Sequence, residues 1–196
     1  MSPSPAGALR DQGHPIGEVF LTRSEIAARV AELGAALATE YEGREPLLVA
    51  PLKSSIVCLA DLSRSLAIDH GFDTVELAAY GGGGGGVRLT KDLDGPIAGR
   101  HVIVIEDVID TGLTLSFLVR TFAERAPASL AAVSLLDRPY RRLVDDLPLT
   151  HVGFTAPDEL FAGYGLGIDE RWRSLPDLHI VVASELARVT GAGLAA

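Results

Sequence analysis

The segment that most constrains the fold is His101–Ser116, which reads HVIVIEDVIDTGLTLS. Val102–Ile105 is an unbroken run of β-branched apolar residues, the pattern of a strand buried on both faces of a parallel sheet. Acidic and hydroxyl residues follow this run, and apolar residues then recur at helical spacing from Leu115. The segment therefore predicts a buried strand, a polar turn and a helix.

The polar turn is typical of a phosphate site. In an open α/β sheet, ligands bind beyond the carboxyl ends of the strands, where the N–H groups of a helix N-terminus favour anions. Glu106 and Asp107 would repel a phosphate unless they hold ribose hydroxyls or a Mg²⁺ ion bound to the same ligand. The alternative is an ordinary turn capped by Asp and Thr. The buried strand, the acidic pair, the third acid and the Thr-Gly-x-Thr turn together favour the ligand site.

This segment resembles the phosphoribosyl pyrophosphate (PRPP) motif of type I phosphoribosyltransferases, and within them the hypoxanthine-guanine branch. No P-loop pattern GxxxxGK[ST] occurs in the sequence. The resemblance implies that Asp110 is the catalytic general base and that Glu106 and Asp107 also bind Mg²⁺. It further implies that the ribose and 5′-phosphate of PRPP bind Glu106, Asp107, Asp110, Thr111, Gly112, Leu113 and Thr114.

A second candidate anion site follows Leu47–Leu52, another predicted buried strand. A lysine with free backbone N–H groups between a strand and a helix suits an anion. The segment LVAPLKSSIVCLADLSRSL resembles the pyrophosphate loop of the family, whose Leu-Lys peptide is commonly cis. The resemblance implies that Lys53 and Ser54 bind pyrophosphate, with Ser54 in place of a family glycine.

Two further segments imply a base pocket. LLDRP resembles the family's LLDKP, whose lysine donates to the exocyclic oxygen of a 6-oxopurine, and this assigns Arg138 to the base. VGFTAPDELFAGYGLGIDERWRSLPDL resembles a second family segment, which implies base contacts for Leu160 and Phe161 and a pyrophosphate contact for Arg173. Gly167 stands where the family has a metal-binding aspartate, so Asp169 becomes a candidate metal ligand.

Six consecutive glycines at positions 81–86 have the composition of a flexible linker. The family has a mobile lid at this place in the chain, which opens with Ser-Tyr. Tyr80 matches the lid tyrosine, and Ala79 stands in place of the serine. The resemblance therefore implies that this segment is a lid.

Composition limits the classes of partner and the location. The formal net charge of −9 argues against nucleic acid and acidic membranes, which require a basic face. The single Cys58 excludes an internal disulfide, and its apolar surroundings predict a core residue. We expect a cytoplasmic protein, because the sequence shows neither a signal peptide nor a membrane span.

The order of elements predicts an α/β fold. Strands alternate with helices, which favours a doubly wound, mainly parallel sheet with helices on both faces. The resemblance adds a small hood built from the chain ends. Residues 1–14 are predicted to form a flexible tail and residues 15–196 a single domain, with a helix capped by Ser24 near its start.

We therefore expect a Mg²⁺-dependent purine phosphoribosyltransferase of purine salvage. It would transfer the 5-phosphoribosyl group from PRPP to hypoxanthine or guanine and release pyrophosphate. We also expect a homo-oligomer, either a dimer or a tetramer. Two alternatives stay open: the same chemistry on a different or modified base, and a catalytically weak regulator of the same fold that binds PRPP or a nucleotide.

Overall fold

The computed structural model describes residues 4–79 and 87–190 of the chain. It divides into two compact units, a larger one over residues 27–157 and a smaller one formed by the chain up to residue 26 and from residue 158 on. The second unit thus comes from both chain ends, as the resemblance implied for the hood. No helix of the described residues is both long and apolar enough to cross a membrane.

The larger unit is an α/β layer structure built on one six-stranded sheet. The sheet order is β4-β3-β2-β5-β6-β7, and all neighbours pair in parallel except β4, which pairs antiparallel to β3. The elements are α2 (Arg23–Glu40, in this unit from residue 27), β2 (Leu47–Leu52), α3 (Ile56–Ser65), β3 (Gly71–Ala79), β4 (Val87–Lys91), β5 (His101–Ile109), α4 (Leu113–Ala123), β6 (Ser129–Asp137), the 3₁₀ turn η1 (Pro139–Arg141) and β7 (Leu149–Thr155).

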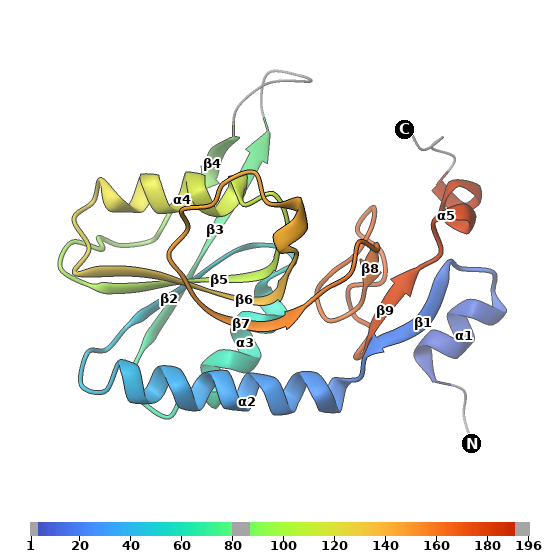
Figure 1. Ribbon diagram of the computed structural model, residues 1–196, viewed down its shortest axis with the longest axis horizontal. Coiled ribbons are helices and arrows are strands. Elements are labelled where there is room, and N and C mark those ends of the chain that lie inside the picture. Colours follow the sequence, from blue (N-terminus) through green and yellow to red (C-terminus); the bar gives the residue numbers. More distant parts are fainter. Residues whose placement is uncertain (1–3, 80–86, 191–196) are drawn as a thin grey trace. The chain divides into compact units, whose positions relative to one another are not determined.

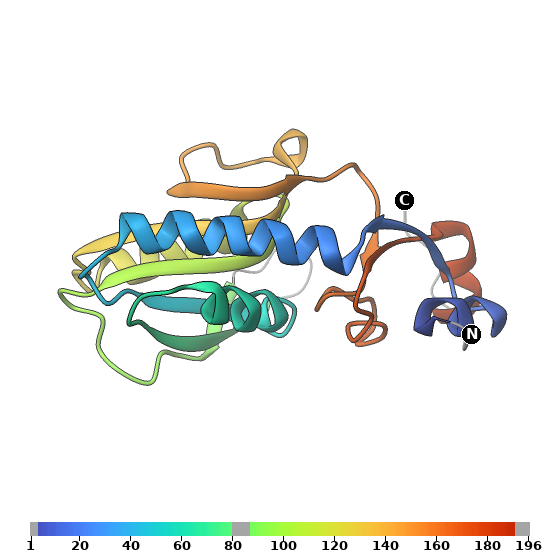
Figure 2. The same ribbon diagram turned by 90° about the horizontal axis from the view of Figure 1, so that it is seen from below.

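Helices cover both faces of this sheet, which confirms the doubly wound prediction. α4 lies on one face, and α2 and α3 lie on the other (Figures 1 and 2). Val102 and Val104 of β5 belong to the same apolar cluster as Leu118 and Phe122 of α4. Because alternate residues of a strand point to opposite faces, the equally buried Ile103 lies on the face toward α2 and α3.

β5 is longer than the apolar run predicted. Glu106 and Asp107 were expected to end the strand, but the strand continues through them to Ile109. β6 pairs with β5 along this whole extension, since Ile109 is the register partner of Asp137. The acidic pair is therefore held within the sheet and is buried with it.

Two helix boundaries differ from prediction. Thr22, and not Ser24, caps α2: the Thr22 hydroxyl accepts from the Glu25 N–H at 3.2 Å, and the Glu25 carboxylate accepts from the Thr22 N–H at 2.8 Å. This reciprocal pair is a capping box. The apolar spacing of Ile56, Leu59, Leu62 and Leu66 in the sequence predicts a helix that continues to Gly71, whereas α3 ends at Ser65. Gly71 instead begins β3, where it pairs with Leu47.

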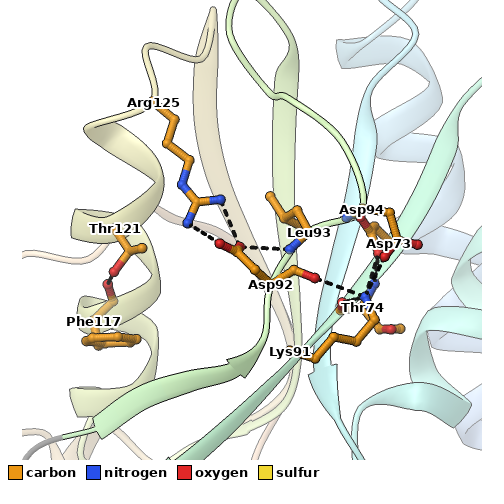
Figure 3. A network of polar contacts seen from close by, with 9 residues as sticks. All are labelled: Asp73, Thr74, Lys91, Asp92, Leu93, Asp94, Phe117, Thr121 and Arg125. Carbon is orange, nitrogen blue, oxygen red and sulfur yellow. Dashed lines mark hydrogen bonds and ion pairs between the residues drawn. The ribbon is translucent and has the colours of Figure 1, made fainter.

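Charged side chains connect β3, β4 and the end of α4 (Figure 3). The Asp73 carboxylate accepts from the N–H of Asp94 at 2.7 Å and from Lys91 Nζ at 3.3 Å. Beside it, Arg125 donates two hydrogen bonds to the Asp92 carboxylate, each 2.8 Å long. These bonds fix the segment that leaves β4 onto the sheet and onto α4.

The smaller unit contains the three-stranded antiparallel sheet β1-β9-β8. Its core is a cluster that includes Ile16, Trp172 and Leu186. Residues 5–11 form a helix where the sequence predicted a loose tail: the Ser4 side chain accepts from the Gly7 N–H at 3.1 Å, and Ala6 is buried in the core. The elements are α1 (Pro5–Asp11), β1 (Ile16–Leu21), β8 (Phe161–Ala162), β9 (Leu178–Val181) and α5 (Ala183–Thr190).

Candidate functional site

The turn between β5 and α4 requires glycine at its centre. Gly112 has φ +81°, in the left-handed region that side chains disfavour. A Cβ atom there would lie 2.9 Å from Leu147 Cδ1 and 3.0 Å from Arg142 Cδ. The Leu143 N–H donates to the Thr111 carbonyl at 2.9 Å and draws the following loop against the turn. The turn is therefore compact and fixed by its neighbours.

The turn encloses a small hollow at the carboxyl end of β5, with a volume of about 80 Å³. α4 begins here, and the first N–H groups of a helix have no partner within the helix. Such groups, with the threonine hydroxyls, bind an anion of the size of a phosphate. The lining residues are Glu106, Val108, Ile109, Asp110, Thr111, Gly112, Thr114 and Leu115. All of them except Val108, Ile109 and Leu115 were predicted site residues.

The acidic pair is buried beside this hollow. Glu106 is 5% and Asp107 4% exposed, and Glu106 Oε1 and Asp107 Oδ2 have no hydrogen-bond partner. Burial raises the pKa of Glu106 well above its usual range, and the adjacent Asp107 charge raises it further. Burial also raises the pKa of Asp107, although hydrogen bonds from Ser54 and Ser55 oppose this. Two buried carboxylates with open acceptors need a cation or a hydroxyl-bearing ligand.

These carboxylates fit a Mg²⁺ ion bound together with a ligand. Within residues 4–79 and 87–190, no three acidic, histidine or cysteine side chains form a metal cluster. Mg²⁺ does not require one, because it usually binds through one or two carboxylates, waters and the phosphates of its substrate. The unpartnered oxygens of Glu106 and Asp107 supply that number of protein ligands.

The β2–α3 loop lies at the same edge of the sheet. β2 and β5 are parallel neighbours, so the loops that follow them emerge side by side. The Leu52-Lys53 peptide is cis, as the resemblance implied. Ser55, which the sequence did not single out, donates from Oγ to Asp107 Oδ1 at 3.0 Å. The candidate pyrophosphate loop and the acidic pair are thus in direct contact.

Arg138 follows β6 and lies against the same turn. It is 7% exposed, and its backbone N–H donates to the Ile109 carbonyl at 3.0 Å. Its Nη1 lies 3.8 Å from Asp110 Oδ2, and Arg141 Nε lies 2.9 Å from Asp110 Oδ1. Arg141 was not among the predicted site residues. Its spacing of three from Arg138 could have indicated it, because residues three apart share a face of a 3₁₀ turn.

In the smaller unit, the predicted base residues differ in exposure. Phe161 is buried and packs on Phe20, with ring centroids 5.0 Å apart. Leu160 is 39% exposed, and its carbonyl accepts from the Val181 N–H at 2.8 Å. The candidate lid residue Tyr80 and the six glycines lie outside the described residues, so the structure does not bear on them.

The loop after β8 holds the predicted Arg173. Its guanidinium donates to the Gly165 carbonyl at 2.9 Å and lies 3.4 Å from Glu170 Oε1. A Cβ atom at Gly167 would lie 2.2 Å from the Arg171 carbonyl oxygen, so this loop conformation leaves no room for a side chain there. Asp169 is exposed and has φ +47°.

Cys58 is a core residue, as predicted. Its side chain is buried in α3, and burial together with the charges of Asp107 and Asp61 raises the pKa of the thiol to about 12. A thiol in this state is not a nucleophile near neutral pH. Cys58 is therefore not a candidate catalytic residue.

A mainly parallel sheet with a helix N-terminus and buried carboxylates at its carboxyl edge is the architecture of an α/β protein that can bind a phosphorylated ligand. The family model described as "Phosphoribosyl transferase domain" matches residues 20–158, and the chain belongs to this family. It is accordingly an enzyme of the pentosyltransferase class.

The similar proteins have consistent names. A hypoxanthine-guanine phosphoribosyltransferase of Bacillus subtilis is 39% identical over 86% of this chain and 94% of its own length. A hypoxanthine phosphoribosyltransferase of Salmonella typhimurium is 42% identical over 84% of this chain and 95% of its own. The crystal structure of a hypoxanthine-guanine phosphoribosyltransferase from Bacillus anthracis superposes with a TM-score of 0.80 at 40% identity, and covers 85% of this chain and 99% of its own.

Proposed function

We propose that the enzyme transfers the 5-phosphoribosyl group of PRPP to a ring nitrogen of hypoxanthine or guanine and releases pyrophosphate. The observation that carries the proposal is the contact between Arg138 and residues 110–114, which we call the phosphate turn, with Nη1 of Arg138 3.8 Å from Asp110 Oδ2. Arg138, a hydrogen-bond donor for the base, and Asp110, an acceptor for the proton of the base, thus lie together at the phosphate turn. The names of the similar proteins support the same substrates.

Arg138 selects the base in this proposal. A guanidinium has five N–H donors and no acceptor. The O6 of hypoxanthine or guanine accepts from such a donor, whereas the amine of adenine would leave both groups unpaired in a buried site. Since Arg138 is 7% exposed, water cannot readily replace the lost hydrogen bond. We therefore expect 6-oxopurines to be preferred over adenine.

The phosphate turn positions the sugar. The 5′-phosphate binds the first N–H groups of α4 and the hydroxyls of Thr111 and Thr114, while Glu106 and Asp107 bind the ribose hydroxyls. The carboxylates also bind Mg²⁺, which when present neutralises charge on the departing pyrophosphate. The assignment of Mg²⁺ is supported by the two buried, unpartnered carboxylate oxygens.

Cationic side chains assist the leaving group. Bond cleavage leaves positive charge on the sugar and negative charge on pyrophosphate, so fixed positive charge beside pyrophosphate lowers the barrier. We assign this role to Lys53 and Arg173, with Ser54 as a further hydrogen-bond partner of pyrophosphate. Asp110 accepts the N7 proton of the purine as general base.

Other assignments rest on the family resemblance. Tyr80 is proposed to act in a lid, Leu160 and Phe161 to contact the base, and Asp169 to assist metal binding. We also propose that the enzyme works in purine salvage in the cytoplasm as a dimer or tetramer. Size-exclusion chromatography with light scattering measures the oligomeric state.

A base panel tests the proposed function. Purified enzyme with Mg²⁺ and PRPP is given hypoxanthine, guanine, xanthine, adenine or a modified 6-oxopurine, and pyrophosphate release is followed. The proposal predicts the highest kcat/KM for hypoxanthine or guanine. A modified purine as best substrate would indicate the same chemistry in a specialised pathway, and tight PRPP binding without turnover of any base would indicate a regulator.

A further inference from the structure

Ser55 occupies an unusual position for a helix-capping serine. It is the N-cap residue of α3, yet its side chain makes no capping hydrogen bond. A serine there ordinarily accepts from an N–H of the first helical turn. The Ser55 hydroxyl instead donates to Asp107 Oδ1 at 3.0 Å and accepts from the Asp107 N–H at 3.2 Å.

This pair of hydrogen bonds links two functional loops. Ser55 directly follows Lys53 and Ser54 of the candidate pyrophosphate loop, whereas Asp107 belongs to the acidic pair on β5. Both residues are buried, with Ser55 0% and Asp107 4% exposed, so water does not compete for these bonds. The contact therefore fixes the distance between the loop and the carboxylate.

The contact also determines which carboxylate oxygen is open. Ser55 donates to Asp107 Oδ1 and Ser54 also bonds this carboxylate, whereas Oδ2 is buried and has no hydrogen-bond partner. A hydroxyl that both donates to the carboxylate and accepts from the N–H of the same residue holds its side chain in one rotamer. Asp107 thus presents Oδ2 as its free acceptor.

We infer that Ser55 is a positioning residue for PRPP binding, acting through Asp107 by holding Oδ2 free and by fixing the pyrophosphate loop beside it. This inference rests on the proposed function. A merely structural hydroxyl would contribute to folding stability and leave the metal dependence of PRPP binding unchanged. A positioning residue alters that dependence, because the oxygen offered to the metal or ribose is no longer fixed.

The test compares Ser55→Ala and Ser55→Cys with wild type by calorimetric titration of PRPP at several Mg²⁺ concentrations. The cysteine keeps the side-chain volume but is a poor donor, and it serves if the alanine variant folds poorly. We expect PRPP affinity to fall at least about tenfold in both, the scale of one hydrogen bond to a charged group. The Mg²⁺ concentration for half-saturation should rise, while the KM for hypoxanthine stays near wild type.

The matched control is Ser129→Ala. Ser129 begins β6, and its hydroxyl forms a hydrogen bond of 2.7 Å with His101 Nδ1 at the amino ends of β5 and β6, away from the site. This control removes a comparable hydrogen bond and should leave PRPP affinity and Mg²⁺ dependence unchanged. An equal loss of affinity in the control would contradict the inference, because it would show a general effect of destabilisation.

A double-mutant cycle identifies the route of the effect. If Ser55 acts through Asp107, Ser55→Ala should cost little further PRPP affinity in an Asp107→Asn background. Additive losses, or wild-type affinity in the single variants, would overturn the inference while the proposed function stands. A wild-type enzyme that fails to bind PRPP at any Mg²⁺ concentration would instead overturn the proposed function, and this inference with it.

Discussion

Arg138 and Asp110 form a charge pair at the carboxyl edge of the sheet, with Nη1 3.8 Å from Oδ2. They come from the ends of the adjacent parallel strands β6 and β5, whose pairing brings them together. In the proposed reaction a purine is held between these two groups, with O6 at the arginine and N7 at the aspartate. Arg141 Nε also lies 2.9 Å from Asp110 Oδ1, so both arginines neutralise this carboxylate in the free enzyme.

Loss of the general base should lower turnover without lowering PRPP affinity. Asp110→Asn is nearly isosteric but cannot accept a proton, so kcat should fall by about 10² to 10⁴ while PRPP affinity changes little. Steady-state kinetics and calorimetry measure the two effects. Asp146→Asn, an exposed change in the loop before β7, is the control and should behave as wild type. Undiminished turnover at neutral pH would remove Asp110 from this role.

Arg138 should control base selectivity. Arg138→Lys retains a cationic donor and should keep or improve hypoxanthine turnover, since lysine is the family residue. Arg138→Ala should reduce the preference for hypoxanthine over adenine, because no buried donor is left to reject the amine. The ratio of kcat/KM values for the two bases reports this, with exposed Arg44→Ala as control. A preference unchanged in Arg138→Ala would show that this residue does not read the base.

The phosphate turn could be predicted because the residues that define it are adjacent in the sequence. A buried apolar strand, an acidic pair and a Thr-Gly-x-Thr turn are adjacent in sequence, and the structure gives β5, the hollow and α4 in that order. The strand end was misplaced because Glu106 and Asp107 are polar. Their burial depends on β6 pairing alongside them, which is a tertiary effect.

Contacts between distant segments were not predictable. The Ser55–Asp107 bond joins residues 52 apart in the chain, so no local sequence pattern indicates it. Arg141 meets Asp110 only because β5 and β6 are neighbours. The N-terminal tail was misjudged for a similar reason: α1 is a short helix, and Ala6 and its neighbours are ordered by packing in the smaller unit.

Gly112 should be irreplaceable in the phosphate turn. Gly112→Ala places a methyl group 2.9 Å from Leu147 Cδ1 and forces a left-handed φ on alanine. We expect a loss of about 1–3 kcal/mol in the free energy of unfolding and weaker PRPP binding. Gly95→Ala is the control, since its Cβ would meet nothing within 4 Å. Equal stability and PRPP affinity of the two variants would contradict the account of the turn.

The network at Asp73 should make the free energy of unfolding depend on pH. Burial alone would raise the pKa of Asp73, but hydrogen bonds from the Asp94 and Thr74 N–H groups and from Lys91 outweigh it and lower the pKa below 3.8. Because the pKa of Asp73 is lower in the folded state, its ionised carboxylate stabilises the folded protein. This stabilisation is complete above pH 3.8 and is lost as the pH falls through the folded-state pKa. Asp73→Asn removes the charge at every pH.

We therefore expect Asp73→Asn to lower the free energy of unfolding by about 1–3 kcal/mol at pH 7, and the difference from wild type to shrink below pH 4. Urea unfolding at a series of pH values measures this. Exposed Asp69→Asn should show no such difference at any pH. A difference that stays constant into acid would mean that the charge of Asp73 is not what stabilises the network.

The central claim is that a phosphoribosyl group passes from PRPP to a 6-oxopurine. The most direct measurement incubates the purified enzyme with Mg²⁺, PRPP and hypoxanthine and quantifies both products by chromatography and mass spectrometry. The account predicts one pyrophosphate for each purine nucleoside monophosphate. Neither product should form when hypoxanthine is omitted, and both should form about 10² to 10⁴ times more slowly when Asp110→Asn replaces wild type. Pyrophosphate released without a nucleotide product, or no consumption of PRPP, would contradict it.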